Sequence, residues 1–412
     1  MLDPTADPAE PAELGLDPRR LQRIERHLAT YVENDVLAGW QVAVARHGRL
    51  AYTATCGHRD REAGLAVEQD TLWRIYSMTK PITTVAALSL MEEGAFELTD
   101  PVSKYLPAFA DVRVWSGGTP QAPQTVPAVE PIRMWHLLSH TSGLTYGFMN
   151  THPVDALYRA HGFDFGNAGG RDLAACADEW AQLPLLFQPG TQWAYSVATD
   201  VLGRVLEVLA GKPLDAVLTE RVLAPLGMTD TRWWVDQPEA GRLGALYTPH
   251  PETGAATRLD SVGLAALRAP AMLSGGGGLV STASDYLRFA EMLRRGGEYD
   301  GVRVLGPRTL AYATRNHLPG GHDLASFGSG QFSEVAYAGV GFGLGFSVTT
   351  EPVRSKVIGS IGDFGWGGAA STAFWVDPVE DLCVLFFTQL LPSSRYPIRT
   401  QLRQLVHQAI VA

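Results

Sequence analysis

Lysine is scarce in this chain: four lysines, at positions 80, 104, 212 and 356, stand beside 29 arginines. Arginine stays protonated in proteins, whereas a buried lysine can lose its proton. The chain therefore has few positions at which an amine could act as a base. Only Lys80 has a serine three residues upstream, at Ser77. The sequence between them, Ser-Met-Thr-Lys, is the first candidate for chemistry.

Positive charge and long apolar runs are also lacking. The chain holds 33 Lys and Arg against 43 Asp and Glu, a net charge of −10, so we expect no nucleic-acid partner and no anionic membrane surface. No window approaches 18 consecutive apolar residues, which predicts no membrane span. The start of the chain is acidic and Pro-rich, unlike a secretion signal.

Cysteine is equally sparse, with Cys56, Cys176 and Cys383 far apart and no CxxC or Cys/His metal pattern. An odd number of dispersed cysteines favours free thiols in a reducing compartment. We therefore expect a cytoplasmic protein that holds neither a metal nor another cofactor.

Several motifs of other enzyme classes are absent. No Gly-x-Ser-x-Gly occurs, which excludes the α/β-hydrolase nucleophile turn. The run 275–278 is all glycine but lacks the lysine and the preceding strand of a phosphate-binding loop, so we interpret it as a tight turn. His136 and His140 have the i, i+4 spacing of zinc ligands without the intervening glutamate or an evident third ligand. They are interpreted as structural residues at a helix end.

Ser77 and Lys80 lie where an extended segment turns into a helix. Positions i and i+3 share a helix face, so the Lys80 amine can approach the Ser77 oxygen. Pro81 is compatible with a first helical turn, and the positive helix terminus favours a developing alkoxide. The chemical interpretation is a nucleophile with a neutral amine as its base. The alternative is that Ser77 caps a helix and Lys80 is a solvated first-turn residue.

Two later stretches offer partners for this pair. Tyr195 ends a Pro-Gly loop just before a helix, and a buried phenol could share a proton with a neutral lysine. Taken alone, this tyrosine is better interpreted as a core aromatic. The stretch 362–369, Gly-Asp-Phe-Gly-Trp-Gly-Gly-Ala, runs into a strand, and its edge N–H groups could form half of an oxyanion hole. Its alternative interpretation is an aromatic turn into an edge strand.

Hydropathy patterns predict strands near both ends of the chain and helices between them. The fold class is therefore α/β (α+β), a mostly antiparallel sheet flanked by helices and built from both chain ends, with an inserted all-helical domain. The predicted domains are a flexible arm at 1–15, a sheet domain at 16–80 plus 259–412, and the helical domain at 81–258. Predicted strands cover 41–46, 49–55, 342–349, 371–376 and 382–390. Predicted helices cover 17–34, 77–92, 132–138, 172–183, 197–209, 214–223, 281–295 and 396–411, and long loops cover 111–130, 144–170 and 317–340.

Together these motifs carry a family resemblance. The three motifs follow one another in the order and at the spacing of a known family: Ser77-x-x-Lys80, then Tyr195, then Trp366-Gly-Gly. Two further stretches support the match, His-Leu-Leu-Ser-His-Thr-Ser-Gly at 136–143 and Gly-Gly-Gly-Gly-Leu-Val-Ser-Thr-Ala at 275–283. Over about residues 17–410 the chain resembles the serine β-lactamase and penicillin-binding-protein-like hydrolases, most closely the family VIII carboxylesterases. The resemblance implies the sheet-plus-helical-domain fold with the site between the two parts.

The resemblance also implies roles for particular residues. Ser77 matches the nucleophile, Lys80 its paired base and Tyr195 the second-motif tyrosine, while the N–H groups of Ser77 and Ala369 resemble the oxyanion hole. Further matching positions are Trp366, Gly367, Gly368, Tyr146 and Val197 for substrate binding and Asp200 as a supporting residue.

Two departures from the family pattern indicate the substrate class. β-Lactamases of this type carry Lys-Thr-Gly at the third motif and an asparagine two residues after the tyrosine; here Trp366-Gly-Gly and Val197 stand there. The cation for a substrate carboxylate is gone, and an indole favours uncharged groups. This indicates ester hydrolysis of a small-molecule substrate through an acyl-enzyme on Ser77, with Lys80, or Lys80 and Tyr195 together, as base. β-Lactamase, D-amino-peptidase or acyltransferase activity, and a non-enzymatic binding protein, are the alternatives.

Overall fold

The structure is a computed structural model that describes residues 8–165, 168–328 and 337–411. The predicted arm falls partly outside the described residues, at 1–7, and the predicted loop 317–340 does so at 329–336.

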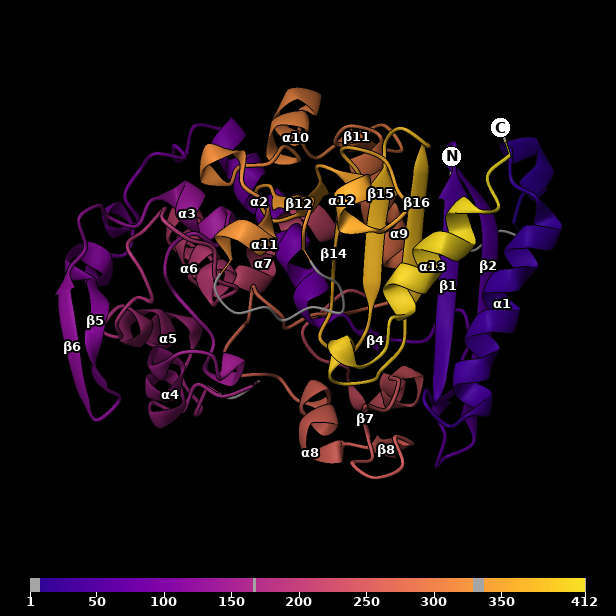
Figure 1. Cartoon of the computed structure of the whole chain (residues 1–412), viewed down its shortest axis with the longest axis horizontal. Coiled ribbons are helices and arrows are strands. Elements are labelled where there is room, and N and C mark those ends of the chain that lie inside the picture. The colour runs from indigo at the N-terminus through magenta and orange to yellow at the C-terminus, as the bar shows by residue number, and fades with distance from the viewer. Residues whose placement is uncertain (1–7, 166–167, 329–336, 412) are drawn as a thin grey trace.

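Both ends of the chain form one antiparallel sheet, as predicted from the sequence (Figure 1). Its strands are β1 (Gly39–Arg46), β2 (Arg49–Asp60), β3 (Leu65–Ala66), β12 (Val340–Phe342), β13 (Ser347–Thr349), β14 (Phe364–Gly367), β15 (Ala373–Asp377) and β16 (Leu382–Phe387). Among the described residues their order is β12-β13-β14-β15-β16-β1-β2-β3. The N-terminal hairpin joins the C-terminal strands where β1 pairs with β16, with Gln41 opposite Phe387 and Arg46 opposite Leu382.

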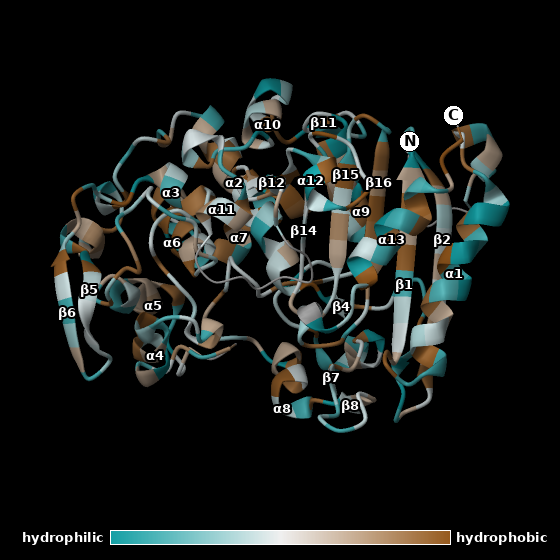
Figure 2. Ribbon diagram, viewed as in Figure 1, coloured by the Kyte–Doolittle hydropathy of each residue, from teal (hydrophilic) through white to brown (hydrophobic). Residues whose placement is uncertain are grey.

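Helices cover both faces of the sheet. On one face lie α1 (Pro18–Glu33), which Asp17 caps, and α13 (Ile398–His407); their apolar sides share a core with Trp375 and Leu382. Helix α9 (Ala283–Arg294), capped by Thr282, packs on the other face. Figure 2 shows hydrophobic residues along β16 and hydrophilic ones on the outer sides of α1 and α13. Burial on both faces explains why β1 and β16 are buried along their whole length.

The region between the two halves of the sheet is mainly helical. Its central helix, α2 (Thr79–Glu92), is buried on nearly all sides, which agrees with its apolar composition. The predicted helices are confirmed with small changes at their ends. They are α2 (Thr79–Glu92), α3 (Met134–Leu138), α5 (Leu173–Trp180), α6 (Ala198–Ala210) and α7 (Leu214–Leu218), the last continued by a π-helical turn at Thr219–Leu223.

Two predicted loops are wrong in part. Residues 111–130 contain a hairpin of β5 (Arg113–Thr119) and β6 (Ala122–Pro127), so the inserted region is not all helical. Its prolines sit on exposed two-stranded edges, where a missing N–H costs little. Residues 144–170 contain α4 (Pro153–Ala160), which begins with a proline at its first turn.

Two further expectations need correction. The predicted strand 342–349 is a hairpin of β12 and β13, because Gly345 (φ 82°) lies in the left-handed region that a turn uses. Residues 8–15 are not a loose arm, since a 3-10 turn at Pro11–Leu14 buries Leu14, and Arg46 donates a hydrogen bond to the Leu14 carbonyl at 2.9 Å.

Short elements complete the described chain. They are β4 (Trp73–Arg74), β7 (Tyr247–Pro249), β8 (Ala256–Arg258), α8 (Asp260–Gly263), β9 (Val280–Ser281), β10 (Glu298–Tyr299), β11 (Val302–Arg303), α10 (Pro307–Ala313), α11 (Leu324–Phe327) and α12 (Pro352–Ser355). No helix in the described ranges has the length and apolar character needed to cross a bilayer.

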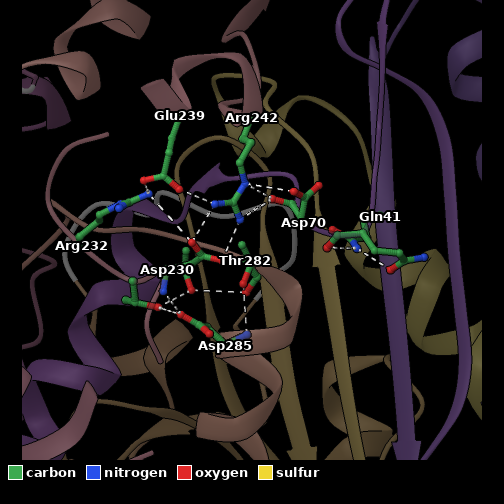
Figure 3. A network of polar contacts seen from close by, with 11 residues as sticks. Gln41, Asp70, Asp230, Arg232, Glu239, Arg242, Thr282 and Asp285 are labelled. Atoms are coloured by element: carbon green, nitrogen blue, oxygen red, sulfur yellow. Dashed lines mark hydrogen bonds and ion pairs between the residues drawn. The ribbon is translucent and has the colours of Figure 1, made fainter. Parts of the chain in front are cut away.

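A polar network fixes the segment that leads into β4 and Ser77 (Figure 3). Arg242 pairs with the carboxylates of Asp70, Asp230 and Glu239 and donates to the Asp70 carbonyl at 3.0 Å. Asp285, near the start of α9, accepts a hydrogen bond from the Asp230 N–H at 2.8 Å. The network thereby ties the inserted region to the sheet domain beside the nucleophile segment.

Candidate active site

Ser77 lies in a 3-10 turn, Tyr76–Met78, between β4 and α2. β4 pairs with β9, which anchors the turn on its N-terminal side. Tyr76 has φ 42°, in the left-handed region that a bulky residue seldom adopts. Such backbone strain is a feature of functional sites. Ser77 faces a cavity that Tyr195, Trp366 and Ala369 also line.

The Lys80 side chain points back to Ser77 from the first turn of α2. Its Nζ lies 3.3 Å from Ser77 Oγ, and Lys80 is only 2% exposed. Burial lowers the pKa of Lys80 to about 7, against the opposing effect of the Asp200 carboxylate. The interpretation of Lys80 as a solvated residue is therefore wrong, and Ser77 makes no capping hydrogen bond at the start of α2.

Tyr195 also lies beside the serine and lines the same cavity. Its hydroxyl faces the Ser77 side chain and accepts a hydrogen bond from Trp366 Nε1 at 3.2 Å. The Lys80 Nζ lies 4.4 Å from the centre of the Tyr195 ring, over its face. Burial raises the pKa of Tyr195, so the phenol stays protonated near neutral pH. Tyr195 thus lies beside Ser77 and contacts Lys80 through the face of its ring.

The phenol that contacts Lys80 belongs to Tyr146. The Lys80 Nζ donates to the Tyr146 hydroxyl at 3.0 Å and to the Gly276 carbonyl at 2.6 Å. Tyr146 also lies near Asp200, which is 2% exposed and accepts a hydrogen bond from the Gly276 N–H at 2.9 Å. These contacts place the Tyr146 hydroxyl against the lysine, and its contact with substrate stays a prediction. Burial raises the pKa of both Tyr146 and Asp200.

The third motif forms the end of β14 and the turn that follows it. Gly367 is the last residue of β14, and the turn 368–372 leads into β15. A Cβ on Gly368 would lie 2.4 Å from the Ile75 carbonyl oxygen, so only glycine fits this close to the nucleophile segment. Ala369 lines the same cavity as Ser77. The oxyanion hole formed by their two N–H groups stays a prediction.

The cavity has a volume of about 160 Å³ and extends from Ser77 along β14 towards α13. Its walls mix aromatic rings with hydroxyl groups, as expected for a small organic ligand. They include Trp366, Phe374, Trp375, Tyr337, Ser347 and Thr349. Val197 does not line this cavity; it is 4% exposed and packs in the core at the start of α6. A direct contact between Val197 and substrate stays a prediction.

The two histidines considered as zinc ligands make other contacts. His136 Nδ1 accepts a hydrogen bond from the Arg133 N–H at 2.9 Å, which satisfies the start of α3. His140 Nδ1 lies 3.2 Å from Ser196 Oγ, and its ring packs 5.1 Å from that of Tyr195. Burial lowers the pKa of both imidazoles, so they stay neutral and structural.

Two contributions to the site escaped the sequence analysis. Gly276 binds Lys80 through its backbone carbonyl, and a carbonyl direction leaves no mark on the sequence beyond the glycine run itself. Arg399 of α13 donates to the Gly368 carbonyl at 2.8 Å from 31 residues away along the chain. The only sequence signal for it is an arginine in a predicted C-terminal helix.

Comparisons with known proteins agree with the fold and identify the family. A family model described as Beta-lactamase matches residues 24–408. Protein Rv1367c of Mycobacterium tuberculosis is 38% identical over 87% of this chain and 87% of its own. Esterase EstB of Burkholderia gladioli is 33% identical over 94% of this chain and 93% of its own. The solved structure of EstCE1, described as a hydrolase with promiscuous acyltransferase activity, superposes with a TM-score of 0.79 at 29% identity, covering 94% of this chain and 99% of that one.

Proposed function

This chain belongs to the Beta-lactamase family, and we propose that it is a serine carboxylesterase that acts through an acyl-enzyme on Ser77. The observation that carries the proposal is the buried Lys80 amine, 3.3 Å from Ser77 Oγ, with a pKa lowered to about 7. An amine that is largely neutral at physiological pH can accept the serine proton.

The acylation step uses the groups that surround Ser77. Ser77 Oγ attacks the ester carbonyl carbon while its proton passes to Lys80. The N–H groups of Ser77 and Ala369 stabilise the negative oxygen of the tetrahedral intermediate. Collapse of the intermediate breaks the bond to the alcohol oxygen. Tyr195, which lies beside Ser77, delivers a proton to the departing alcohol and recovers one from Lys80, which had taken the serine proton, so the proton count balances.

Deacylation repeats these steps with water in place of the alcohol. Water adds to the acyl carbonyl, loses its proton to the same basic groups, and the carboxylic acid leaves as Ser77 regains its proton. Tyr146 and the Gly276 carbonyl hold the Lys80 amine in place during both steps. The closing proton transfer restores the resting state, and no cofactor is consumed.

The residues that line the cavity support a particular class of substrate. We expect esters whose acyl and alcohol groups are uncharged and whose acyl chains are short to medium in length. Trp366 occupies the third-motif position at which a lysine would meet a substrate carboxylate. Its indole packs 5.5 Å from the Tyr195 ring and 5.2 Å from the Phe342 ring, which makes this wall apolar. Esterase EstB, which is named for ester hydrolysis, supports the same assignment.

Acyl transfer to an alcohol other than water is the second candidate on the same site. EstCE1, described as having promiscuous acyltransferase activity, favours it. The two reactions share the acyl-enzyme and differ only in which hydroxyl compound enters afterwards. β-Lactam hydrolysis and D-amino-peptidase activity need recognition of a carboxylate, which this third motif does not supply through a lysine.

A chain-length series of p-nitrophenyl esters, run beside nitrocefin, tests the proposal. We expect turnover of p-nitrophenyl butyrate with a burst of nitrophenol when deacylation is slow, little hydrolysis of nitrocefin, and complete loss in Ser77→Ala. Adding an alcohol distinguishes transfer from hydrolysis by the ester product. Activity that survives Ser77→Ala, or nitrocefin as the far better substrate, contradicts the assignment.

We also propose a cytoplasmic location. Cys176 and Cys383 are buried free thiols, and Cys56 is free and partly exposed. Unpaired cysteines persist most easily in a reducing compartment.

A further inference from the structure

The turn that follows β14 is held by its backbone against the nucleophile segment. The Gly368 N–H donates to the Thr372 carbonyl at 2.9 Å, and the Gly368 carbonyl accepts from the Ser371 N–H at 3.1 Å. Thr372 Oγ1 donates to the Ile75 carbonyl at 3.5 Å, two residues before Ser77. The turn therefore carries Ala369 next to the serine.

Arg399 reaches this turn from a distant part of the chain. Its Nη2 donates to the Gly368 carbonyl at 2.8 Å and to the Thr372 carbonyl at 2.9 Å. The side chain is half-buried on α13. The guanidinium of Arg399 packs directly against Gly367. A Cβ on that glycine would come within 2.5 Å of Arg399 Cζ and 2.6 Å of Nη2. The missing side chain at position 367 is what makes room for the guanidinium.

The Gly368 carbonyl and the Ala369 N–H belong to one planar trans peptide and point in opposite directions. A donor that holds the carbonyl on the α13 side therefore directs the Ala369 N–H away from α13. Gly367 and Gly368 have little conformational preference of their own, and Arg399 adds a side-chain hold to the one that the Ser371 N–H gives the same carbonyl. A charge-assisted hydrogen bond is about twice as strong as a neutral one, which suits this task.

We propose that Arg399 is a positioning residue that fixes the Gly368–Ala369 peptide so that the Ala369 N–H serves the oxyanion hole. The inference rests on the proposed esterase function and names a residue outside its three motifs. Arg399 does not touch the reacting atoms in this account. It acts through the peptide that it holds, and its charge also lowers the pKa of the Tyr195 hydroxyl, against the larger effect of burial.

The test compares Arg399→Met with the unaltered protein on the neutral substrate p-nitrophenyl butyrate. Complete loss of an oxyanion-hole donor costs about 10²–10³ in kcat, and a donor that is only poorly oriented should cost about 10–100-fold. KM should change by less than about threefold, since the ground-state ester gains little from the hole. The affinity for a boronic acid, whose tetrahedral adduct mimics the intermediate, should fall by a factor similar to that for kcat.

Gln401→Leu is the matched control on the same helix. Gln401 Oε1 accepts hydrogen bonds from Tyr31 at 2.7 Å and His27 at 2.8 Å, so its loss loosens α13 against α1 without touching the turn. We expect kcat and boronic-acid affinity to be retained in this variant. Arg399→Lys keeps a cationic donor and should recover part of the lost kcat.

A double-mutant cycle adds a second readout. In Gly367→Ala the new methyl group displaces the guanidinium, so its cost should resemble that of Arg399→Met. Combined with Arg399→Met, it should add much less than its own single cost, because both changes remove the same hold. If the double variant loses kcat by the product of the two single factors, the two changes do not share a mechanism.

The outcomes separate the inference from the proposed function. If the unaltered protein shows no Ser77-dependent turnover, the esterase proposal fails. If turnover depends on Ser77 but Arg399→Met keeps kcat and boronic-acid affinity, or loses them no more than Gln401→Leu, the positioning role is overturned.

Discussion

The Lys80 Nζ donates a hydrogen bond to the hydroxyl of Tyr146 at 3.0 Å, and the Tyr146 ring packs 5.5 Å from that of Tyr195. Two tyrosines thus contact the same amine, one through its hydroxyl and the other through the face of its ring. The Tyr146 hydroxyl accepts a hydrogen bond from Lys80, whereas the Tyr195 hydroxyl lies beside Ser77 and accepts a hydrogen bond from Trp366. This division of contacts leads to different expectations for the two phenols.

Tyr195→Phe should reduce kcat/KM for p-nitrophenyl butyrate more than Tyr146→Phe does. The first change removes the hydroxyl next to the nucleophile and its proton transfer, worth about 10²–10⁴-fold. The second leaves Lys80 its contacts with Ser77 and the Gly276 carbonyl, so the loss should be about tenfold, as for one hydrogen bond to a charged group. Steady-state kinetics of both variants decide the order. If Tyr146→Phe proves the more damaging, the two roles must be exchanged.

The activity should rise with pH through a midpoint near 7. Burial lowers the pKa of Lys80 from its ordinary value of 10.5 to about 7, and only the unprotonated amine can take the serine proton. Activity is therefore present above this pKa and lost as the pH falls through it. The profile of kcat/KM against pH measures this for the free enzyme. A midpoint close to the ordinary value for lysine, about 10.4, would rule out a buried neutral base.

Asp200→Asn tests whether the pH profile reports the titration of Lys80, through the direction in which the midpoint moves. The Asp200 carboxylate favours the charged form of Lys80 and so raises its pKa. Removal of that charge should lower the pKa of Lys80 and move the midpoint of the profile to lower pH. A midpoint that moves to higher pH would contradict the assignment of the profile to Lys80.

Trp366→Phe should lower kcat about 2–10-fold, the equivalent of one neutral hydrogen bond. The change keeps an aromatic wall but removes the Nε1 donor that lies 3.2 Å from the Tyr195 hydroxyl. Trp193→Phe is the control, because Trp193 packs 6.1 Å from the same tyrosine ring in a stacked arrangement. Stopped-flow measurement of the acylation phase is the readout. Equal losses in the two variants would mean that packing, and not the hydrogen bond, matters.

Arg242→Met should destabilise the fold by about 2–3 kcal/mol while the folded fraction stays reactive at Ser77. The change removes the ion pairs to Asp70, Asp230 and Glu239 in a half-buried network (Figure 3). Arg303→Met, which removes an exposed pair at 3.4 Å, should cost at most about 1 kcal/mol. Urea unfolding curves compare the two. Equal stability losses would show that the network contributes no more than a surface pair.

The sequence was sufficient for the two-ended sheet and for the three motifs. The Ser77–Lys80 spacing is local, so helical geometry alone brings the two side chains together. Tyr195 and Trp366 were found because each stands in a glycine-containing stretch next to a regular element. The part of the site that could be predicted was therefore the part that local sequence determines.

The remainder depends on contacts between distant segments. Tyr146 and Val197 were assigned to substrate binding because they match positions of the family pattern, and a match does not say which way a side chain points. In the structure the Tyr146 hydroxyl accepts a hydrogen bond from Lys80, and Val197 directly precedes α6 and packs in the core. Gly276 and Arg399 act on or through backbone carbonyls, which every residue has. The β5–β6 hairpin escaped because its prolines resemble a loop when the edge exposure is unknown.

Fluorophosphonate labelling followed by peptide mapping tests the central claim most directly. A fluorophosphonate reacts with an activated serine through the same attack that opens ester hydrolysis. We predict a single adduct on Ser77, whose rate of formation rises with pH through about 7 and which Lys80→Met nearly abolishes in a folded protein. An adduct on any other residue, or rapid labelling of Ser77 that persists in Lys80→Met, would contradict the account.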